Sequence, residues 1–212
     1  MRFSYNPDIS VIMATFNREH YLEKAVKSVI SQSFTNWELL IVDDGSKDNT
    51  FKTLDPFLCD FPNIRYMKHR NRKAALSRNA GIQASFGRYI TFLDSDDHYL
   101  DNHLESRITQ IEELREVALL SGGFQCDKNT MVKDFYNTDK LINVRECILG
   151  GTFFGKRELF FDINGFRDME YGEDTDLWER ASKLFAVKKI ENPETYVYER
   201  AKDSISLNYS AG

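Results

Sequence analysis

The stretch WELLIVDDGS, residues 37–46, decides the fold. Its first six residues are apolar except for one glutamate, which is the pattern of a strand that is buried on both faces. The aspartates, glycine and serine that follow are typical of a turn, so this strand ends in carboxylates. The stretch YITFLDSDD, residues 89–97, repeats this plan with a buried strand and three aspartates. Two such strands favour a sheet with an acidic edge.

The residues around these two stretches alternate between strand and helix patterns. Between residues 9 and 114, four apolar runs alternate with four segments that we interpret as helices from their apolar spacing and their turn residues. We expect strands at 9–16, 37–42, 64–67 and 89–93, and helices at 19–32, 49–58, 75–85 and 102–114. Short connections between alternating strands and helices are typical of a parallel sheet. The predicted class is therefore α/β, with a mostly parallel sheet flanked by helices.

The pattern changes after about residue 117. Further strands are expected at 117–121, 130–136, 150–154, 187–190 and 195–198, with helices at 157–162 and 174–185. The segment 130–136 alternates in polarity, as an antiparallel strand does. We interpret this part as a smaller region attached to the first, because no linker or repeat separates them.

Composition excludes several classes of protein. The chain has 212 residues, enough for one domain, and a net charge of -5 without a basic stripe, so a nucleic-acid partner is not expected. Its three cysteines are far apart, which argues against a disulfide framework or a zinc site and favours reduced thiols in the cytoplasm. No apolar run is long enough to cross a bilayer. Peripheral attachment at the inner face of a membrane stays open.

The aspartates in the segment 94–97 are candidates for a metal site. Carboxylates that crowd at a strand end repel one another, and a divalent cation such as Mg²⁺ or Mn²⁺ relieves that repulsion. The alternative is that Asp97 or Asp101 caps the helix that follows. The residues alone leave both explanations open.

The ends of the first two strands are candidates for nucleotide binding. Asp43 and Asp44 are explained by a turn, but a carboxylate at this point of a parallel sheet could also accept a hydrogen bond from a base or a ribose. Phe16 is either a core residue or a platform for a nucleobase, with Arg18 near phosphate.

Two charged segments remain. The basic segment 69–73, with Arg78 beyond it, is by itself a solvated loop, but beside acidic loops it resembles a clamp for a diphosphate. Glu173, Asp174 and Asp176 begin a helix, where acidic residues are common as caps. A carboxylate there could also act as a general base that takes a proton from an acceptor hydroxyl.

As a set, these stretches resemble the family 2 glycosyltransferases over nearly the whole chain. The matching segments are 11–18, 31–34, 37–46, 77–81, 87–90, 92–97, 165–166 and 172–177. The resemblance implies a GT-A fold, which is Rossmann-like. It further implies that residues 1–212 form a single glycosyltransferase domain, with a nucleotide-sugar-binding half at 1–116 and an acceptor-side half at 117–212.

The resemblance also implies roles for individual residues. Asp94 and Asp96 would form the DxD motif and bind Mn²⁺ or Mg²⁺, with Asp96 the direct ligand. Asp174 would be the catalytic base. The residues implied in nucleotide binding are Thr15, Phe16, Arg18, Asp43, Asp44, Arg78, Asp94 and Ser95. One departure is Lys73, which occupies a position where the family often has glycine.

The implied activity is an inverting, metal-dependent transfer of a hexosyl or N-acetylhexosaminyl group from a nucleotide sugar, expected to be UDP-linked. The acceptor would be a hydroxyl of a saccharide or of a lipid-linked saccharide, in the synthesis of cell-surface polysaccharide or glycoconjugate. No membrane helices or long acceptor-binding tail are present, so processive synthesis across a membrane is not expected. The alternatives are a non-catalytic paralogue that binds nucleotide sugars and a phospho-receiver-like signalling domain. The sequence does not specify the donor sugar, the acceptor or the oligomeric state.

Overall fold

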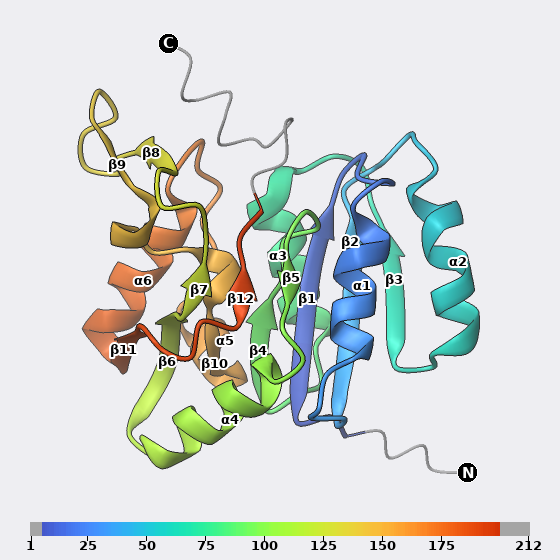
Figure 1. Cartoon of the computed structure of the whole chain (residues 1–212), viewed down its shortest axis with the longest axis horizontal. Helices are drawn as coiled ribbons and strands as arrows, with labels where there is room; N and C mark the ends of the chain where they lie inside the picture. The colour runs from blue at the N-terminus through green and yellow to red at the C-terminus, as the bar shows by residue number, and fades with distance from the viewer. Residues whose placement is uncertain (1–5, 200–212) are drawn as a thin grey trace.

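The computed structural model of the chain describes residues 6–199, and a seven-stranded sheet forms its centre. The strand order is β11-β6-β10-β4-β1-β2-β3 (Figure 1). All neighbouring pairs are parallel except those of β10, which runs antiparallel to β4 and β6. The strands are β1 (Ile9–Thr15), β2 (Trp37–Asp43), β3 (Ile64–Lys68), β4 (Tyr89–Phe92), β6 (Val117–Gly122), β10 (Phe154–Lys156) and β11 (Ala186–Ile190).

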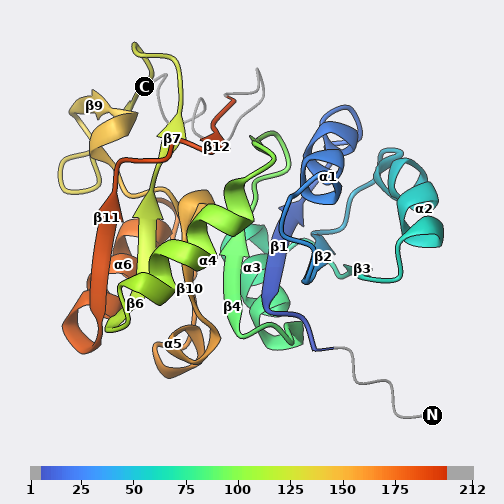
Figure 2. The ribbon, with the colours of Figure 1, turned by 60° about the horizontal axis from the view of Figure 1, so that its bottom comes forward.

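Helices cover both faces of this sheet. On one face lie α1 (Leu22–Ile30), α2 (Thr50–Asp60) and α4 (His103–Glu113); on the other lie α3 (Lys73–Ala84), α5 (Arg157–Asp162) and α6 (Glu173–Leu184) (Figure 2). Successive side chains of a strand point to opposite faces. Val11 therefore packs in the core under α1, and Ile12 packs in the core under α3. This burial on both faces explains why the central strands β1, β2 and β4 are mostly apolar.

Smaller elements lie above the carboxyl ends of the central strands. β5 (His98–Tyr99), β12 (Tyr196–Val197) and β7 (Phe124–Gln125) form a three-stranded sheet in that order. β8 (Met131–Lys133) and β9 (Leu141–Asn143) form an antiparallel hairpin. Two 3₁₀ turns follow, η1 (Val144–Glu146) and η2 (Gly150–Thr152). In Figure 1 the hairpin stands at the upper left of the molecule, and β12 lies nearer the middle, beside β5.

The α/β prediction is confirmed, and the four strand–helix units of the first half lie within a few residues of their expected bounds. Most of the errors lie in the second half. The segment 150–154 was expected to be a strand, but its glycines form η2 and the strand β10 starts only at Phe154. The expected strand 130–136 shrinks to β8, and β5, β7 and β9 were not predicted. Strands of two or three residues are too short to show a period in the sequence.

The central sheet takes strands from both halves of the chain. β10 inserts between β4 and β6, so a strand from the second half pairs directly with one from the first. The insertion of β10 places the start of α6 beside the end of β4. The acidic segments of the two halves are thereby brought together. None of the helices in residues 6–199 combines the length and the apolar character that a bilayer span requires.

Candidate active site

One pocket of about 920 Å³ lies at the carboxyl ends of the parallel strands. One side of it is lined by residues 14–18 at the end of β1, by Asp44 after β2 and by residues 94–97 after β4. The opposite side is built from the second half, by the segments 132–136, 146–151 and 169–175. The three loops that end the strands therefore open on the same edge, as the sequence predicted.

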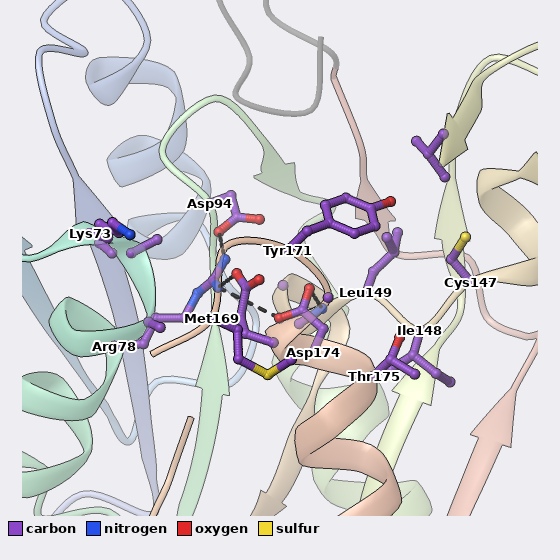
Figure 3. Close-up of a pocket in the computed structure, with 18 of the residues that line it drawn as sticks. Lys73, Arg78, Asp94, Cys147, Ile148, Leu149, Met169, Tyr171, Asp174 and Thr175 are labelled. Carbon is purple, nitrogen blue, oxygen red and sulfur yellow. Dashed lines mark hydrogen bonds and ion pairs between the residues drawn. The ribbon is translucent and has the colours of Figure 1, made fainter. Parts of the chain in front are cut away.

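Arg78 of α3 lies at the centre of the charged part of the pocket (Figure 3). Its Nη2 donates a hydrogen bond to Asp94 at 2.7 Å, and its Nη1 donates to Glu173 at 3.1 Å and lies 3.6 Å from Asp174. Burial alone would lower the pKa of Arg78, but the three carboxylates hold it above its ordinary value. Arg78 is thus a fixed cation that joins the acids of the two halves.

Asp174 lies in the first turn of α6. Its Oδ2 accepts a hydrogen bond from the backbone N–H of Gly150 at 2.8 Å. Its Oδ1 is buried and accepts no hydrogen bond from any residue in 6–199. Burial and the charge of neighbouring Glu173 raise the pKa of Asp174 to about 7, although Arg78 acts in the opposite direction. A carboxylate with a vacant acceptor atom and a pKa near neutrality is suited to take a proton from a hydroxyl.

The two glycines of η2 make room for this arrangement. A Cβ atom on Gly150 would come within 2.2 Å of the Oδ1 of Asp174. A Cβ atom on Gly151 would come within 2.3 Å of the hydroxyl of Tyr196 and within 3.2 Å of Asp94. Any larger residue at either position would push one of these side chains away. The glycines at 150–151, expected to open a strand, instead let the backbone approach the acids closely.

Asp44 holds the loop between β3 and α3 in place. Its two carboxylate oxygens accept hydrogen bonds from the backbone N–H groups of Arg72 at 2.6 Å and Lys73 at 2.9 Å. The hydroxyl of Thr15, beside it in the pocket, is buried and has no hydrogen-bond partner among residues 6–199. A buried hydroxyl of this kind is a candidate to bond a ligand, because it is costly to leave unpaired.

Asp43 does not reach the pocket. It is fully buried and accepts hydrogen bonds from the Tyr66 hydroxyl at 2.5 Å and from the backbone of Ser46 at 2.7 Å. Burial acts to raise the pKa of Asp43, but these hydrogen bonds and the charge of Lys68 hold it below its ordinary value. The structure therefore corrects the expectation of direct nucleotide contact: Asp43 supports the turn that presents Asp44.

The residues of the segment 94–97 fit a divalent cation that is shared with a substrate. Asp94 and Asp96 are partly exposed in the pocket, and carboxylates are the hard ligands that Mg²⁺ and Mn²⁺ prefer. Burial, followed by the charges of Asp94 and Asp96, raises the pKa of Asp97 well above its ordinary value. No group of three or more potential ligands is assembled within residues 6–199. Two carboxylates plus phosphate oxygens from a substrate are a common set for Mg²⁺.

Asp97 has a different task from its neighbours. It is buried, accepts a hydrogen bond from the Tyr196 hydroxyl, and accepts another from the backbone N–H of Glu199 at 2.7 Å. It does not cap α4, whose N-cap residue Asn102 makes no side-chain cap bond. Asp97 thus ties the acidic loop to the strand β12.

The structure brings together nearly all the residues that the sequence proposed. Thr15, Phe16, Arg18, Asp44, Arg78, Asp94, Ser95, Asp96 and Asp174 all line the pocket. Of the basic segment 69–73, only Asn71 and Lys73 do so, which narrows the predicted diphosphate clamp. Asp174 is not a cap, because its bond goes to Gly150 and the N-cap of α6 is Gly172 without a side-chain bond.

Sequence reasoning missed the residues that organise the pocket from the second half. Tyr196, Gly150 and Gly151 contact or adjoin the acids, and the apolar Leu149 and Met169 line the same wall (Figure 3). The paired glycines were visible as a signal of close backbone approach. Nothing in the local sequence around Tyr196 indicates a partner as distant as Asp97.

The chain resembles known proteins over most of its length. Residues 10–166 match glycosyl transferase family 2. A UDP-Glc:alpha-D-GlcNAc-diphosphoundecaprenol beta-1,3-glucosyltransferase of Escherichia coli is 35% identical over 136 residues, covering 63% of this chain and 52% of that protein. A GalNAc(5)-diNAcBac-PP-undecaprenol beta-1,3-glucosyltransferase of Campylobacter jejuni is 30% identical over 183 residues, covering 81% and 59%. The chain thus spans little more than half the length of these two relatives.

Solved structures share the fold. S. aureus TarS 1-349 in complex with UDP-GlcNAc has a TM-score of 0.77 at 18% identity, covering 97% of this chain and 61% of that one. The mannosyltransferase PcManGT from Pyrobaculum calidifontis, in complex with GDP-Man and Mn2+, has a TM-score of 0.76 at 19% identity, covering 95% and 59%. These structural matches agree with the match to the family, and the fold is that of the GT-A glycosyltransferases. The chain belongs to glycosyl transferase family 2.

Proposed function

We propose that this chain is an inverting, metal-dependent glycosyltransferase that moves a hexosyl or N-acetylhexosaminyl group from a UDP-sugar to a hydroxyl of a lipid-linked saccharide. The proposal includes a single domain, in which residues 1–116 bind the donor and residues 117–212 face the acceptor. The product would enter the synthesis of cell-surface polysaccharide. The undecaprenol-linked acceptors named for the Escherichia coli and Campylobacter jejuni relatives support the acceptor class.

The observation that carries the proposal is the vacant Oδ1 of Asp174. It is a buried acceptor with no hydrogen bond from residues 6–199, and it belongs to a carboxylate whose pKa is raised to about 7. Arg78 Nη1 lies 3.6 Å from this atom, beyond hydrogen-bond distance. A non-catalytic binding module has no need to leave such an atom without a hydrogen bond, since an unsatisfied buried acceptor costs about 1–3 kcal/mol. The position of Asp174 in the pocket of the acidic loop favours a base that acts on the acceptor.

The residues of the donor half would bind the nucleotide. Asp44 and Thr15, which line the pocket, would bond the nucleoside, and the half-exposed ring of Phe16 would offer a face for the base. Asp94 and Asp96 would hold the metal. When bound, the metal supplies positive charge that stabilises the departing diphosphate. Ser95 and Arg78 complete this side of the pocket.

The residues of the acceptor half would then complete the transfer. Asp174 Oδ1 accepts the proton of the acceptor hydroxyl as the hydroxyl oxygen forms its bond to the anomeric carbon. The bond from that carbon to the diphosphate oxygen breaks, and the nucleoside diphosphate leaves with the electron pair. Attack opposite the leaving group inverts the anomeric configuration. Gly150 holds the other oxygen of Asp174 at 2.8 Å, which fixes the base in position.

A panel of nucleotide sugars tests the donor class. The melting temperature of the protein is measured with UDP-, GDP- and dTDP-sugars, each with and without Mn²⁺. Ligands that bind the folded state raise the melting temperature. We expect a rise with UDP-sugars that disappears when the metal is chelated. A rise with GDP-sugars alone would refute the UDP assignment, and no rise with any donor would refute the proposed function.

A further inference from the structure

Lys73 has an unusual backbone. Its φ is +70°, in the left-handed region that side chains other than glycine rarely adopt. The conformation is held from one side by Asp44, which accepts the N–H of Lys73 at 2.9 Å and that of Arg72 at 2.6 Å. A non-glycine residue in this region costs roughly 1–2 kcal/mol, and such costs concentrate at functional sites. A lysine at this position therefore calls for a compensating use of its side chain.

The side chain of Lys73 lines the pocket and is exposed to it. Figure 3 shows Lys73 on the side of the pocket that holds Arg78 and Asp94, away from Cys147 and Thr175. No residue in 6–199 forms an ion pair with its ammonium group. By contrast, the guanidinium of Arg78 is already occupied by Asp94 and Glu173 at 2.7 and 3.1 Å.

The residues that line the pocket carry an excess of negative charge, which an ammonium group would offset. Among the residues that line it, nine are acids and only four, Arg18, Lys73, Arg78 and Lys133, are bases. A diphosphate carries two or more negative charges and would be repelled by this surface. A metal at Asp94 and Asp96 neutralises part of that charge, and a mobile ammonium group on the same side can neutralise more.

We propose that Lys73 binds the diphosphate of the donor, as the cation that the loop between β3 and α3 contributes. The inference rests on the proposed function and adds a residue that determines how tightly the diphosphate is held. Asp44 then has two tasks, because the carboxylate placed to bond the nucleoside also fixes the backbone from which Lys73 reaches the phosphates. The strained backbone is the cost of presenting a side chain there.

Two substitutions distinguish the effect of the Lys73 charge from the effect of its left-handed backbone. Lys73→Met removes the charge and keeps both the length and the left-handed backbone. Lys73→Gly removes the charge and relieves the backbone. The matched control is Lys47→Met, which removes an exposed lysine close to Asp44 that does not line the pocket. Dissociation constants are measured in Mn²⁺ for UDP, GDP and dTDP, and the diphosphate that binds best is compared with its nucleoside.

The two Lys73 variants should have the same effect on binding but different effects on stability. Both Lys73 variants should bind the diphosphate about tenfold more weakly and the nucleoside unchanged, because only the diphosphate meets the charge. Lys73→Gly should also melt about 2 to 4 °C higher than Lys73→Met, since glycine tolerates the backbone. Lys47→Met should bind the diphosphate as the wild type does.

Three outcomes would overturn the inference. Unchanged diphosphate affinity in Lys73→Met, with normal binding by the wild type, rejects Lys73 and leaves the proposed function standing. If the affinity for the nucleoside fell by the same factor, Lys73 would shape the nucleoside site and would not bind the diphosphate. A wild type that binds no nucleoside diphosphate rejects both this inference and the proposed function.

Discussion

Arg78 Nη1 lies 3.6 Å from the Oδ1 of Asp174, while Nη2 of the same guanidinium donates a hydrogen bond to Asp94 at 2.7 Å. A residue of the first half thus connects the acidic loop after β4 with the proposed base on α6. This connection explains why Asp174 can lie partly buried beside Glu173, where burial and the like charge of Glu173 raise its pKa. It also makes the two halves of the pocket depend on one another.

Arg78→Met should destabilise the protein. The substitution leaves three carboxylates without their cation, and removing one partner of a buried ion pair typically costs about 3 kcal/mol or more. We expect added Mn²⁺ to restore part of the loss, because a cation at Asp94 and Asp96 relieves the same repulsion. Urea unfolding with and without Mn²⁺ measures both effects. Arg88→Met removes the exposed ion pair with Glu112 and should cost less than about 1 kcal/mol. Equal losses in the two variants would contradict the role of Arg78.

Asp174→Asn should remove catalysis and leave donor binding intact. General base catalysis contributes about 10²- to 10⁴-fold, so the turnover number should fall by that factor while the UDP affinity stays unchanged. In the wild type, kcat/KM should rise about tenfold per pH unit up to a pH of about 7 and then level off, because only the ionised carboxylate accepts a proton. Steady-state kinetics across pH 5–9 check this. A profile without that rise would exclude Asp174 as the base.

Asp174→Asn, which should remove catalysis, should also raise the stability of the folded protein above neutral pH. The pKa of Asp174 is higher in the folded protein than its ordinary value of 3.8, so the unfolded chain loses this proton first as the pH rises. Asp174 therefore lowers the free energy of unfolding progressively between about pH 4 and pH 7. Asp174→Asn cannot ionise, and its melting temperature should exceed that of the wild type at pH 8 but not at pH 4. A difference independent of pH would show that the effect is unrelated to ionisation.

Gly150→Ala should displace the base without unfolding the protein. The new Cβ would come within 2.2 Å of Asp174 Oδ1, and the side chain must move. A shift of about 1 Å in a catalytic group can cost on the order of 100-fold, so we expect a loss of that size in kcat with little change in UDP affinity. Gly81→Ala is the control, because its Cβ would clash with Ile12 in the core at 2.4 Å. It should lower the melting temperature while the folded fraction keeps its kcat.

Tyr196→Phe should loosen the acidic loop. The hydroxyl of Tyr196 donates to buried Asp97, and leaving that acceptor unpaired should cost about 1–3 kcal/mol of stability. We also expect a several-fold weaker affinity for Mn²⁺, measured by titration in the presence of UDP, because Asp97 adjoins Asp96. Tyr136→Phe loses a 2.6 Å hydrogen bond to Glu179 at an exposed site and should change neither quantity. An unaltered Mn²⁺ affinity in Tyr196→Phe would confine Tyr196 to a purely structural role.

The first half of the chain could be predicted because its signals are local. Strands such as β2 are mostly apolar and buried along their whole length, and the acids that end them must meet at one edge of a parallel sheet. The sequence alone therefore identifies Asp44, Asp94 and Asp96 as candidates for the site. Asp43 was misplaced, because adjacent residues at a strand end point in different directions and the sequence does not say which one faces the pocket.

The second half could not be predicted as well because its contacts are distant in sequence. Gly150 was assigned to a strand, although its backbone bonds to Asp174 on another element. Tyr196 reaches Asp97 because β12 pairs with β5. The strand at 195–198 is expected from the sequence, but β5 is too short to be recognised and the pairing of the two is not visible in either segment. The left-handed backbone of Lys73 is likewise invisible locally, since it is fixed by Asp44.

The measurement that tests the central claim most directly is the release of UDP from UDP-sugars in the presence of a short-chain prenyl-diphosphate saccharide, by the wild type, Asp96→Ala and Asp174→Asn. We predict release by the wild type that requires Mn²⁺, a product of inverted anomeric configuration, and a loss of at least about 100-fold in each variant. Asp174→Asn should still bind UDP with Mn²⁺. Turnover that survived both substitutions would contradict the account.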